Sequence, residues 1–144
     1  MNFTLLPFEG TDSIKLGMTS SEIKSILEDS PEHVNKSSWN NDMDQFDFVQ
    51  VEYNADNKSI SFEFYSPANV FFNNFQIIEA DYFEVKMLFE TLDENLIYEE
   101  EVGFISTKYQ MGIYAPGESS NRIVEAVLVG EESYYDAVVS ELQG

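Results

Sequence analysis

The stretch that decides the fold is Ile14-Lys-Leu-Gly-Met-Thr-Ser-Ser-Glu-Ile-Lys-Ser-Ile-Leu27. It passes from a short extended run through a turn into a helix. Thr19 is placed to cap this helix, because its hydroxyl can accept a hydrogen bond from the Glu22 amide while the Glu22 carboxylate reaches back to the Thr19 amide. The apolar residues that follow have the i, i+3, i+4 spacing of one helix face: Ile23, Ile26 and Leu27. The stretch predicts a fold anchor and carries no chemistry of its own.

The size and composition of the chain predict one folded domain spanning residues 1–144. A chain of 144 residues that is 43% hydrophobic and 15% aromatic can bury a core of its own, unlike a disordered acidic tail. The sequence contains no apolar run near the ~20 residues that span a bilayer, and residues 1–7 lack the features of a signal peptide. The absence of cysteine excludes disulfides and thiol chemistry. We expect a cytoplasmic protein.

Strand patterns dominate the chain after the first helix. Residues 46–53 and 60–65 predict two antiparallel strands around a turn at 54–57, and the alternation in 60–65 indicates one buried and one wet face. Residues 70–72 and 75–78 predict a further hairpin. The polar residues 32–44 predict a long loop.

A second helix is expected to begin after Asp81, with Glu84 at the third position beyond the cap. Its predicted buried face consists of Phe83, Met87, Leu88 and Leu92. Three more strands are expected at 103–107, 111–114 and 123–129, followed by a short helix within 131–142. This order predicts an α+β domain, a mainly antiparallel sheet with two or three helices packed on one face.

The charge is the most unusual property of the sequence. Twenty-seven Asp and Glu residues against seven Lys and Arg give a formal net charge of -20. A field of this sign repels nucleic acid and anionic membranes and accelerates encounter with a basic protein. The alternative is a housekeeping domain whose charge serves only solubility.

The sequence offers little for catalysis or for a cofactor. Its single histidine, His33, lies in a predicted loop, cysteine is absent, and no glycine-rich phosphate loop is present. Residues 40–47 resemble the start of a calcium loop, but Gln45 takes the place of the glycine and Val51 that of the final glutamate. We therefore expect no enzyme, no metal and no cofactor. A small metal-dependent or carboxylate-based enzyme or ligand-binding domain is the alternative.

Three clusters combine carboxylates with aromatic rings and are the candidate partner-binding residues. The first, cluster A, consists of Tyr98, Glu99, Glu100 and Glu101. Cluster B consists of Trp39, Asp42, Asp44 and Asp47. Cluster C consists of Glu131, Glu132, Tyr134 and Tyr135. Such acids pair with Lys or Arg while the ring supplies an anchor that excludes water. For each cluster, the alternative is a solvated face with the aromatic ring in the core.

Two parts of the sequence resemble known bacterial proteins. The segment Ile14-x-Leu-Gly-Met-Thr-x-x-Glu-Ile23 resembles an opening shared by many small bacterial α+β proteins, including outer-membrane-assembly lipoproteins, whose lipidated cysteine this chain lacks. The segments Gly112-Ile-Tyr-Ala-Pro116 and Val124-Glu-Ala-Val-Leu-Val-Gly-x-x-x-Tyr-Tyr-Asp136 resemble small acidic immunity proteins of polymorphic and contact-dependent toxin systems. This resemblance implies a protein that binds and blocks a toxin domain, and it transfers no functional residue.

Charge and resemblance together give the functional hypothesis. We expect a non-enzymatic immunity protein that neutralises a basic, nuclease-like toxin by covering its active or nucleic-acid-binding surface. The expected partner is a basic protein, with no role for nucleic acid or a membrane, and the oligomeric state is left open.

Overall fold

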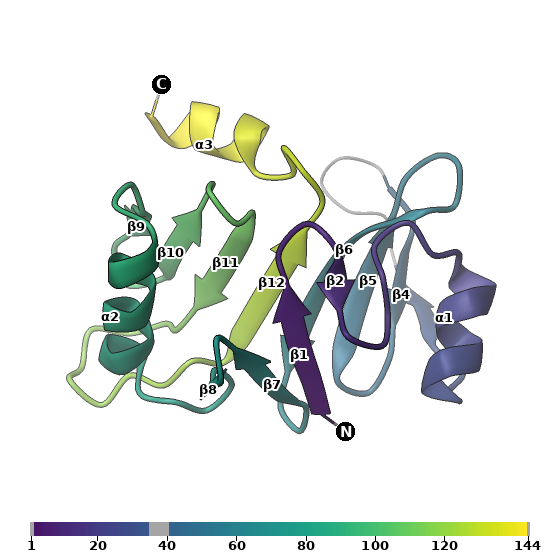
Figure 1. Cartoon of the computed structure of the whole chain (residues 1–144), viewed down its shortest axis with the longest axis horizontal. Helices are drawn as coiled ribbons and strands as arrows, with labels where there is room; N and C mark the ends of the chain where they lie inside the picture. The colour runs from purple at the N-terminus through teal and green to yellow at the C-terminus, as the bar shows by residue number, and fades with distance from the viewer. Residues whose placement is uncertain (1, 35–40, 144) are drawn as a thin grey trace.

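The computed structural model describes residues 2–34 and 41–143. Within these residues the chain forms three helices and two sheets, mostly antiparallel, which confirms the predicted α+β class (Figure 1). The large sheet has the order β3-β4-β5-β6-β12-β11-β10-β9, and the small sheet has the order β2-β1-β7-β8. The strands of the large sheet are β3 (Glu32–Val34), β4 (Met43–Gln45), β5 (Val49–Tyr53), β6 (Ser59–Tyr65), β9 (Ile97–Glu99), β10 (Gly103–Ser106), β11 (Met111–Tyr114) and β12 (Ala126–Gly130). Those of the small sheet are β1 (Asn2–Leu6), β2 (Gly10–Thr11), β7 (Asn69–Phe72) and β8 (Phe75–Gln76).

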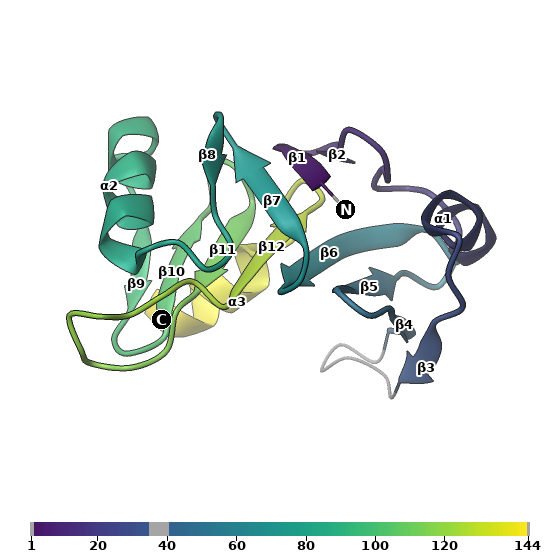
Figure 2. The ribbon, with the colours of Figure 1, turned by 90° about the horizontal axis from the view of Figure 1, so that it is seen from below.

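The three helices lie on both faces of the large sheet. They are α1 (Ser20–Leu27), α2 (Tyr82–Leu92) and α3 (Asp136–Gln143). The small sheet, α1 and α2 lie on one face, called the inner face here, and α3 lies on the opposite, outer face (Figure 2). Two helices thus share a face, as predicted, and the third lies at one end of the other face. No helix in the described part of the chain combines the length and the apolar character needed to cross a bilayer.

The core lies between the inner face of the large sheet and the small sheet with its flanking helices. One row of the inner face runs in register across four strands, from Val51 through Phe62 and Val129 to Met111, and each of these side chains is fully buried. Burying each one contributes about 1.5–3 kcal/mol. The row therefore joins β5, β6, β12 and β11 into one layer.

The stretch 14–27 is anchored to the sheet at its turn. The Gly17 amide donates to the Ser59 carbonyl at 2.8 Å, and the Ser59 amide donates to the Met18 carbonyl at 2.8 Å. Both bonds of the predicted capping box are present, since the Glu22 amide donates to Thr19 Oγ1 at 3.3 Å and the Thr19 amide to Glu22 Oε1 at 3.1 Å. The turn and the cap together fix where α1 begins.

The predicted buried face of α1 is correct at two of its three positions. Ile23 and Leu27 are buried, whereas Ile26 is 40% exposed. An eight-residue helix at the end of the sheet contacts the core along a narrow stripe, and Ile26 lies at the edge of that stripe.

The predicted buried face of α2 is wrong at Phe83 and Met87, whereas Leu88 and Leu92 are half-buried against the core. The buried residues are Tyr82, Val85 and Phe89, while Phe83 and Met87 are 39% and 65% exposed. The helix is apolar on more than one side, so its periodicity fits two faces. Aromatic contacts select the observed one, because the Phe89 ring packs against Phe72 and Phe104 with centroids 5.2 Å away in each case.

The predicted loop at 32–44 is also incorrect in part, because β3 and β4 lie within it. β3 is the edge strand and β4 lies beside it, and each is three residues long with little alternation, so nothing in their pattern indicates a sheet. The predicted hairpin at 70–78 is confirmed as β7 and β8, and β1 pairs in parallel with β7.

The capping box can be tested by removing the threonine hydroxyl. Thr19→Ala should lower the free energy of unfolding by about 1 kcal/mol, because the Glu22 amide loses its acceptor. The Glu22 carboxylate, which accepts from the Thr19 amide, also loses the hydroxyl that helps to orient it. Urea denaturation measures the change. Ser21→Ala is the control, since Ser21 is exposed on the same helix and caps nothing. Equal losses in both variants would contradict the role assigned to Thr19.

Candidate functional site

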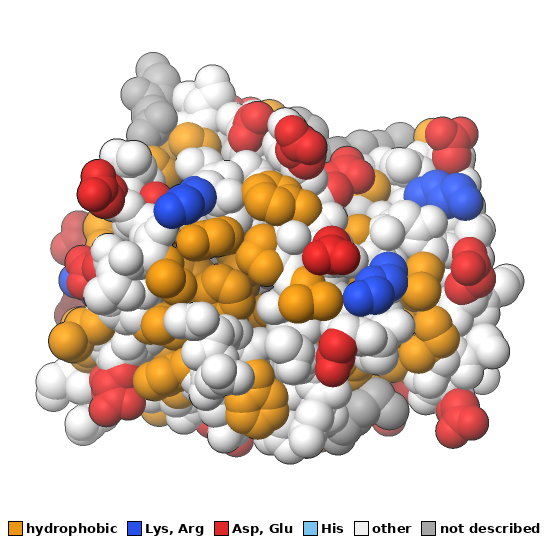
Figure 3. All heavy atoms as spheres, viewed as in Figure 1, with side chains coloured by type: hydrophobic (Ala, Val, Ile, Leu, Met, Phe, Trp, Pro, Cys, Tyr) orange, Lys and Arg blue, Asp and Glu red, His pale blue; other side chains and the backbone are white. Residues whose placement is uncertain are grey.

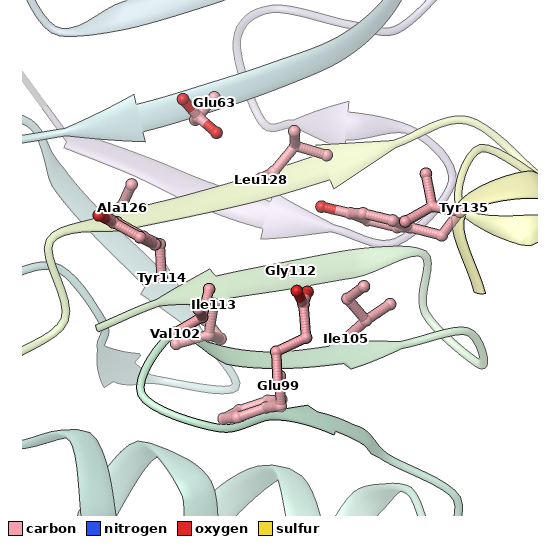
Figure 4. Close-up of a pocket in the computed structure, with 12 residues that line it drawn as sticks. Glu63, Glu99, Val102, Ile105, Gly112, Ile113, Tyr114, Ala126, Leu128 and Tyr135 are labelled. Atoms are coloured by element: carbon pink, nitrogen blue, oxygen red, sulfur yellow. The ribbon is translucent and has the colours of Figure 1, made fainter. Parts of the chain in front are cut away.

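A groove opens on the outer face of the large sheet, beside α3, and encloses about 180 Å³ (Figure 4). Its floor is formed by β6, β12, β11 and β10, and α3 and the end of β9 border it. The residues that line it are Glu63, Glu99, Val102, Phe104, Ile105, Gly112, Ile113, Tyr114, Ala126, Leu128, Tyr135 and Val138. Among the described residues that line the groove, the charged ones are two glutamates, and no lysine or arginine is present.

The floor of the groove is one row of paired residues on neighbouring strands. Glu63 pairs with Leu128, Leu128 with Gly112, and Gly112 with Ile105. Paired residues on adjacent strands point to the same face. The row therefore places one carboxyl at the end of an otherwise apolar floor.

Two glycines make room for the aromatic rings that precede α3. A Cβ atom on Gly112 would lie 2.2 Å from the Tyr135 hydroxyl oxygen and 3.0 Å from its Cζ. A Cβ atom on Gly130 would lie 2.6–2.8 Å from atoms of Tyr134. Real Cβ atoms do not approach so closely, so each tyrosine occupies the space that only a glycine leaves open.

Glu63 is the most unusual group in the groove. Its side chain is half-buried, and no described residue donates a hydrogen bond to its carboxyl. Burial raises the pKa of Glu63 above the ordinary value of 4.5. A carboxyl without a donor in an apolar groove is ready to accept one from a ligand.

The Glu99 carboxylate and the Tyr135 hydroxyl also reach into the groove. Figure 4 shows the Glu99 side chain extending from β9 towards Gly112, and the Tyr135 hydroxyl pointing over the floor. Burial, and then the charges of neighbouring groups that include Glu63 and Glu99, raise the pKa of Tyr135 well above its ordinary value. Tyr135 is therefore a neutral phenol at physiological pH, able to donate and to accept a hydrogen bond.

Next to the groove, Tyr134 closes over a buried carboxylate. Glu52 is 2% exposed, and its Oε1 accepts a hydrogen bond from the Tyr134 hydroxyl at 2.6 Å and one from Ser61 Oγ at 3.4 Å. Asn41 Nδ2 donates to Glu52 Oε2 at 3.0 Å. Three donors thus satisfy this carboxylate, and one of them comes from the segment that leads into α3.

The structure divides cluster A between the two faces. Tyr98 lies on the inner face, where its ring packs against Phe104 at 6.1 Å and its hydroxyl donates to Glu90 Oε2 at 2.8 Å. Burial is the main cause that raises the pKa of Tyr98 to about 12. Glu99 lines the groove. Glu100 and Glu101 are exposed beyond it, and the pKa of Glu101 is raised chiefly by a hydrogen bond with the Glu118 side chain.

Cluster B lies towards the opposite end of the sheet, and Trp39 is outside the described residues. Asp44 faces α1, is 5% exposed and accepts a hydrogen bond from Ser20 Oγ at 2.6 Å. Asp42 and Asp47 are exposed. The Asp44 carboxylate therefore has a structural role, because it joins β4 to the start of α1.

Cluster C lies beside the groove. Glu131 and Glu132 are exposed, and burial together with the nearby Glu52 charge raises the pKa of Glu131. Tyr134 contacts Glu52, and Tyr135 lines the groove. The fold thus brings Glu99 of cluster A and Tyr135 of cluster C to one site.

Sequence analysis missed Glu63. The available signal was its position between Phe62 and Phe64 in the alternating strand, which places its side chain on the wet face. The sequence does not show that α3 and β9 would enclose that part of the face.

No metal centre is formed by the described residues. Across 2–34 and 41–143, no group of three His, Asp or Glu side chains is placed to hold a metal ion. The chemistry of the groove is that of carboxyl and phenol groups against apolar walls.

The Tyr134–Glu52 contact can be tested with a pair of tyrosine variants. Tyr134→Phe removes a donor from a buried carboxylate and should lower the free energy of unfolding by about 1–3 kcal/mol. Tyr135→Phe is the matched control, because its hydroxyl has no hydrogen-bond partner among the described residues and its loss should change stability little. Urea denaturation gives the free energy of unfolding of both variants. A larger loss of stability in Tyr135→Phe than in Tyr134→Phe would contradict the role assigned to the Tyr134 hydroxyl.

The burial of Glu63 predicts a pH-dependent effect of its removal. Because its pKa is raised in the folded state, folded Glu63 holds its proton at pH values where the unfolded chain has released it. Its contribution to stability therefore falls as pH rises through and above 4.5, and stays lower at neutral pH. Urea denaturation measures the free energy of unfolding of Glu63→Gln and of the native chain. The difference between the two should favour the variant more at pH 7 than at pH 4. The same difference at both pH values would refute the effect.

Comparisons with known proteins give no match. No protein-family model, no curated protein and no solved structure matches this chain. The function must therefore be argued from the groove and the surface around it.

Proposed function

We propose that this chain is a non-enzymatic immunity protein that neutralises a basic, nuclease-like bacterial toxin. It would do so by covering the active or nucleic-acid-binding surface of the toxin. The observation that supports this most directly is the outer face, where a groove with two carboxyls is bordered by exposed acids and by no basic lining residue.

The charge of the whole chain favours the same kind of partner. A net charge of -20 attracts a basic surface from a distance and speeds association at low salt. Figure 3 shows acidic side chains scattered over the side of the molecule that carries the small sheet, α1 and α2, with few basic ones among them. Steering therefore comes from the molecule as a whole, whereas specific contact requires a shaped site.

Local crowding of acids provides a second argument. The raised pKa values of Glu101 and Glu131 arise partly from nearby acidic groups, Glu118 and Glu100 in one case and Glu52 in the other. Like charges held close together repel one another, and a basic partner relieves this repulsion on binding. Both residues belong to the clusters that the sequence indicates as partner-binding.

The aromatic residues supply the remaining element of a protein interface. Tyr114 is 45% exposed and Val102 is 37% exposed at the groove. Tyrosine is enriched among the residues that dominate binding energy, because a rigid ring buries a large area while its hydroxyl can form a hydrogen bond. Carboxylates beside such residues fit a surface that meets Lys and Arg side chains.

The proposal can be tested by capture followed by rescue. The immobilised protein is used to isolate partners from the native host, and a captured protein is then expressed alone and together with this chain. We expect the partner to be basic and toxic, growth to be restored by co-expression, and affinity to fall as salt is raised. A captured protein whose toxicity is unchanged by co-expression would overturn the proposal.

Charge reversal locates the interface. Replacing Glu99, Glu100 and Glu101 by lysine should weaken partner binding by at least about tenfold and reduce rescue. The control replaces the exposed acids Glu9, Glu28 and Asp56 by lysine. Three changes of two charges each take the net charge from -20 to -14 in both variants. Equal weakening would show that net charge acts without a site.

A further inference from the structure

On the basis of the proposed function, we propose that the Phe8 ring anchors the basic partner by stacking on one of its arginine side chains. Phe8 lies at a pocket where the β1–β2 turn, the β10–β11 turn and the segment between β12 and α3 meet (Figure 1). This pocket is called the Phe8 pocket here, and it is lined by Phe8, Thr107, Gln110, Glu132, Ser133 and Asp136. The partner thus contacts a second surface beyond the groove.

Phe8 is presented by a strained turn. The Glu9 amide donates to the Leu6 carbonyl at 3.0 Å, which places Phe8 at the third position of a four-residue turn, and the φ angle of Phe8 is 67°. Glycine and asparagine usually take this left-handed position, and asparagine holds the same conformation at three other positions of the described chain. Phe8 is the one aromatic residue with a left-handed backbone among the described residues. Such strain accompanies functional positions.

The Phe8 ring is exposed, and the backbone that carries it is fixed. Phe8 is 46% exposed, and no aromatic or cationic group of the described residues stacks on its ring. Gly10 packs the turn against the core, because a Cβ atom there would lie 2.8 Å from Phe62 Cε2. The Leu16 amide donates to the Glu9 carbonyl at 2.9 Å. A ring held in this way loses little conformational entropy when a partner covers it.

The Phe8 pocket is formed in the free chain. It encloses about 440 Å³, compared with about 180 Å³ for the groove. Gln110 joins its walls and is 4% exposed. The Gln110 side chain accepts a hydrogen bond from the Tyr135 amide at 2.7 Å and donates to the Thr107 carbonyl at 2.8 Å. Its Nε2 also donates to Asp136 Oδ1 at 3.3 Å. These bonds hold the β10–β11 turn against the segment that leads into α3.

The charges at the Phe8 pocket favour a cation. Its charged lining residues are Glu132 and Asp136, and no described lysine or arginine lines it. Lys108 lies in the β10–β11 turn, but its ammonium group donates to the Leu92 carbonyl at 2.7 Å, at the end of α2. An anion, a nucleic acid or a second copy of this chain, with its charge of -20, would be repelled. A cationic side chain of a basic protein complements the pocket.

Arginine fits an exposed ring better than lysine does. A guanidinium is flat and stacks on an aromatic face, whereas an ammonium is a compact and strongly hydrated charge. The cations of this chain follow the same order. Arg122 Cζ lies 4.0 Å from the centroid of the Tyr82 ring. Lys86 Nζ and Lys108 Nζ lie 5.2 and 5.4 Å from the centroids of other tyrosine rings.

The Phe8 pocket continues the surface that the proposed function uses. The segment 131–136 lies between the two cavities, since Tyr135 lines the groove while Glu132, Ser133 and Asp136 line the Phe8 pocket. Glu132 also belongs to cluster C. One partner can therefore contact the groove and the Phe8 ring together.

The experiment uses the blocked tripeptide N-acetyl-Gly-Arg-Gly-amide as the probe. It is titrated into the full-length protein at constant ionic strength, and NMR follows the Phe8 ring protons and the amides of Thr107 and Ser133. We expect saturable shifts at these groups and an upfield ring-current shift of the arginine side-chain protons. Peptides with citrulline, the neutral isostere, or with lysine in place of arginine should bind at least about threefold more weakly. Equal affinity for either peptide would overturn the arginine site.

Variants locate the binding on the ring. Phe8→Asn places at this turn a residue that adopts the left-handed backbone, and it should weaken binding of the arginine peptide by at least about threefold without lowering the urea midpoint. Phe8→Tyr keeps the ring and should keep the affinity. The control Phe83→Ala removes another exposed ring, on α2 and outside the pocket, and should leave binding unchanged. Unchanged binding in Phe8→Asn, or an equal loss in Phe83→Ala, would overturn the proposal.

These measurements are independent of the toxin. If the arginine peptide binds at Phe8 but co-expression rescues no growth, the arginine site stands and the immunity function falls. If the native chain rescues growth but the arginine peptide does not bind, and Phe8→Asn rescues growth equally well, the immunity function stands and the arginine site falls.

Discussion

The alternation of side chains along β6 is the constraint on which the rest of the structure depends. This strand is hydrogen-bonded along both edges, to β5 and to β12, so its side chains can point only to the two faces of the sheet. Phe62 and Phe64 take the inner face and are fully buried in the core. Glu63 is thereby directed to the outer face, into the groove. A shift of register by one residue would bury the carboxyl and expose both rings, so folding and the site depend on the same pairing.

Hydroxyl groups accompany the buried carboxylates of this protein. Ser20 donates to Asp44 at 2.6 Å, Ser106 donates to Asp93 at 2.7 Å, and Tyr134 donates to Glu52 at 2.6 Å. These short distances are typical of a hydroxyl bound to a carboxylate. A neutral donor satisfies the acceptor without cancelling its charge, and the chain has only seven Lys and Arg residues. The interior therefore adds to the negative field, which supports the proposal of a basic partner.

The sequence predicted those features that short segments encode. The Thr19–Glu22 capping box and the α+β class are confirmed, and Phe62 and Phe64 take the buried face predicted for residues 60–65. The wet face predicted there is wrong, because Ser61 is buried and Glu63 and Tyr65 are half-buried. The buried face of α2 was mispredicted in part, because a helix with two apolar stripes is oriented by its contacts, here Phe72 and Phe104. The groove could not be predicted, because it depends on strand order. It joins β6 to β9 and α3, and no local pattern indicates that these segments meet.

The two glycines beneath the tyrosines have a consequence for how the sequence can vary. At Gly112 and Gly130 the limit on side-chain size comes from the rings of Tyr135 and Tyr134, which occupy the positions of the missing Cβ atoms. Each glycine can therefore be replaced only together with its tyrosine. In a related or redesigned sequence, a larger residue at either glycine requires a smaller residue at the matching tyrosine. Coordinated changes at these two pairs would thus mark chains that keep the segment leading into α3 against the outer face.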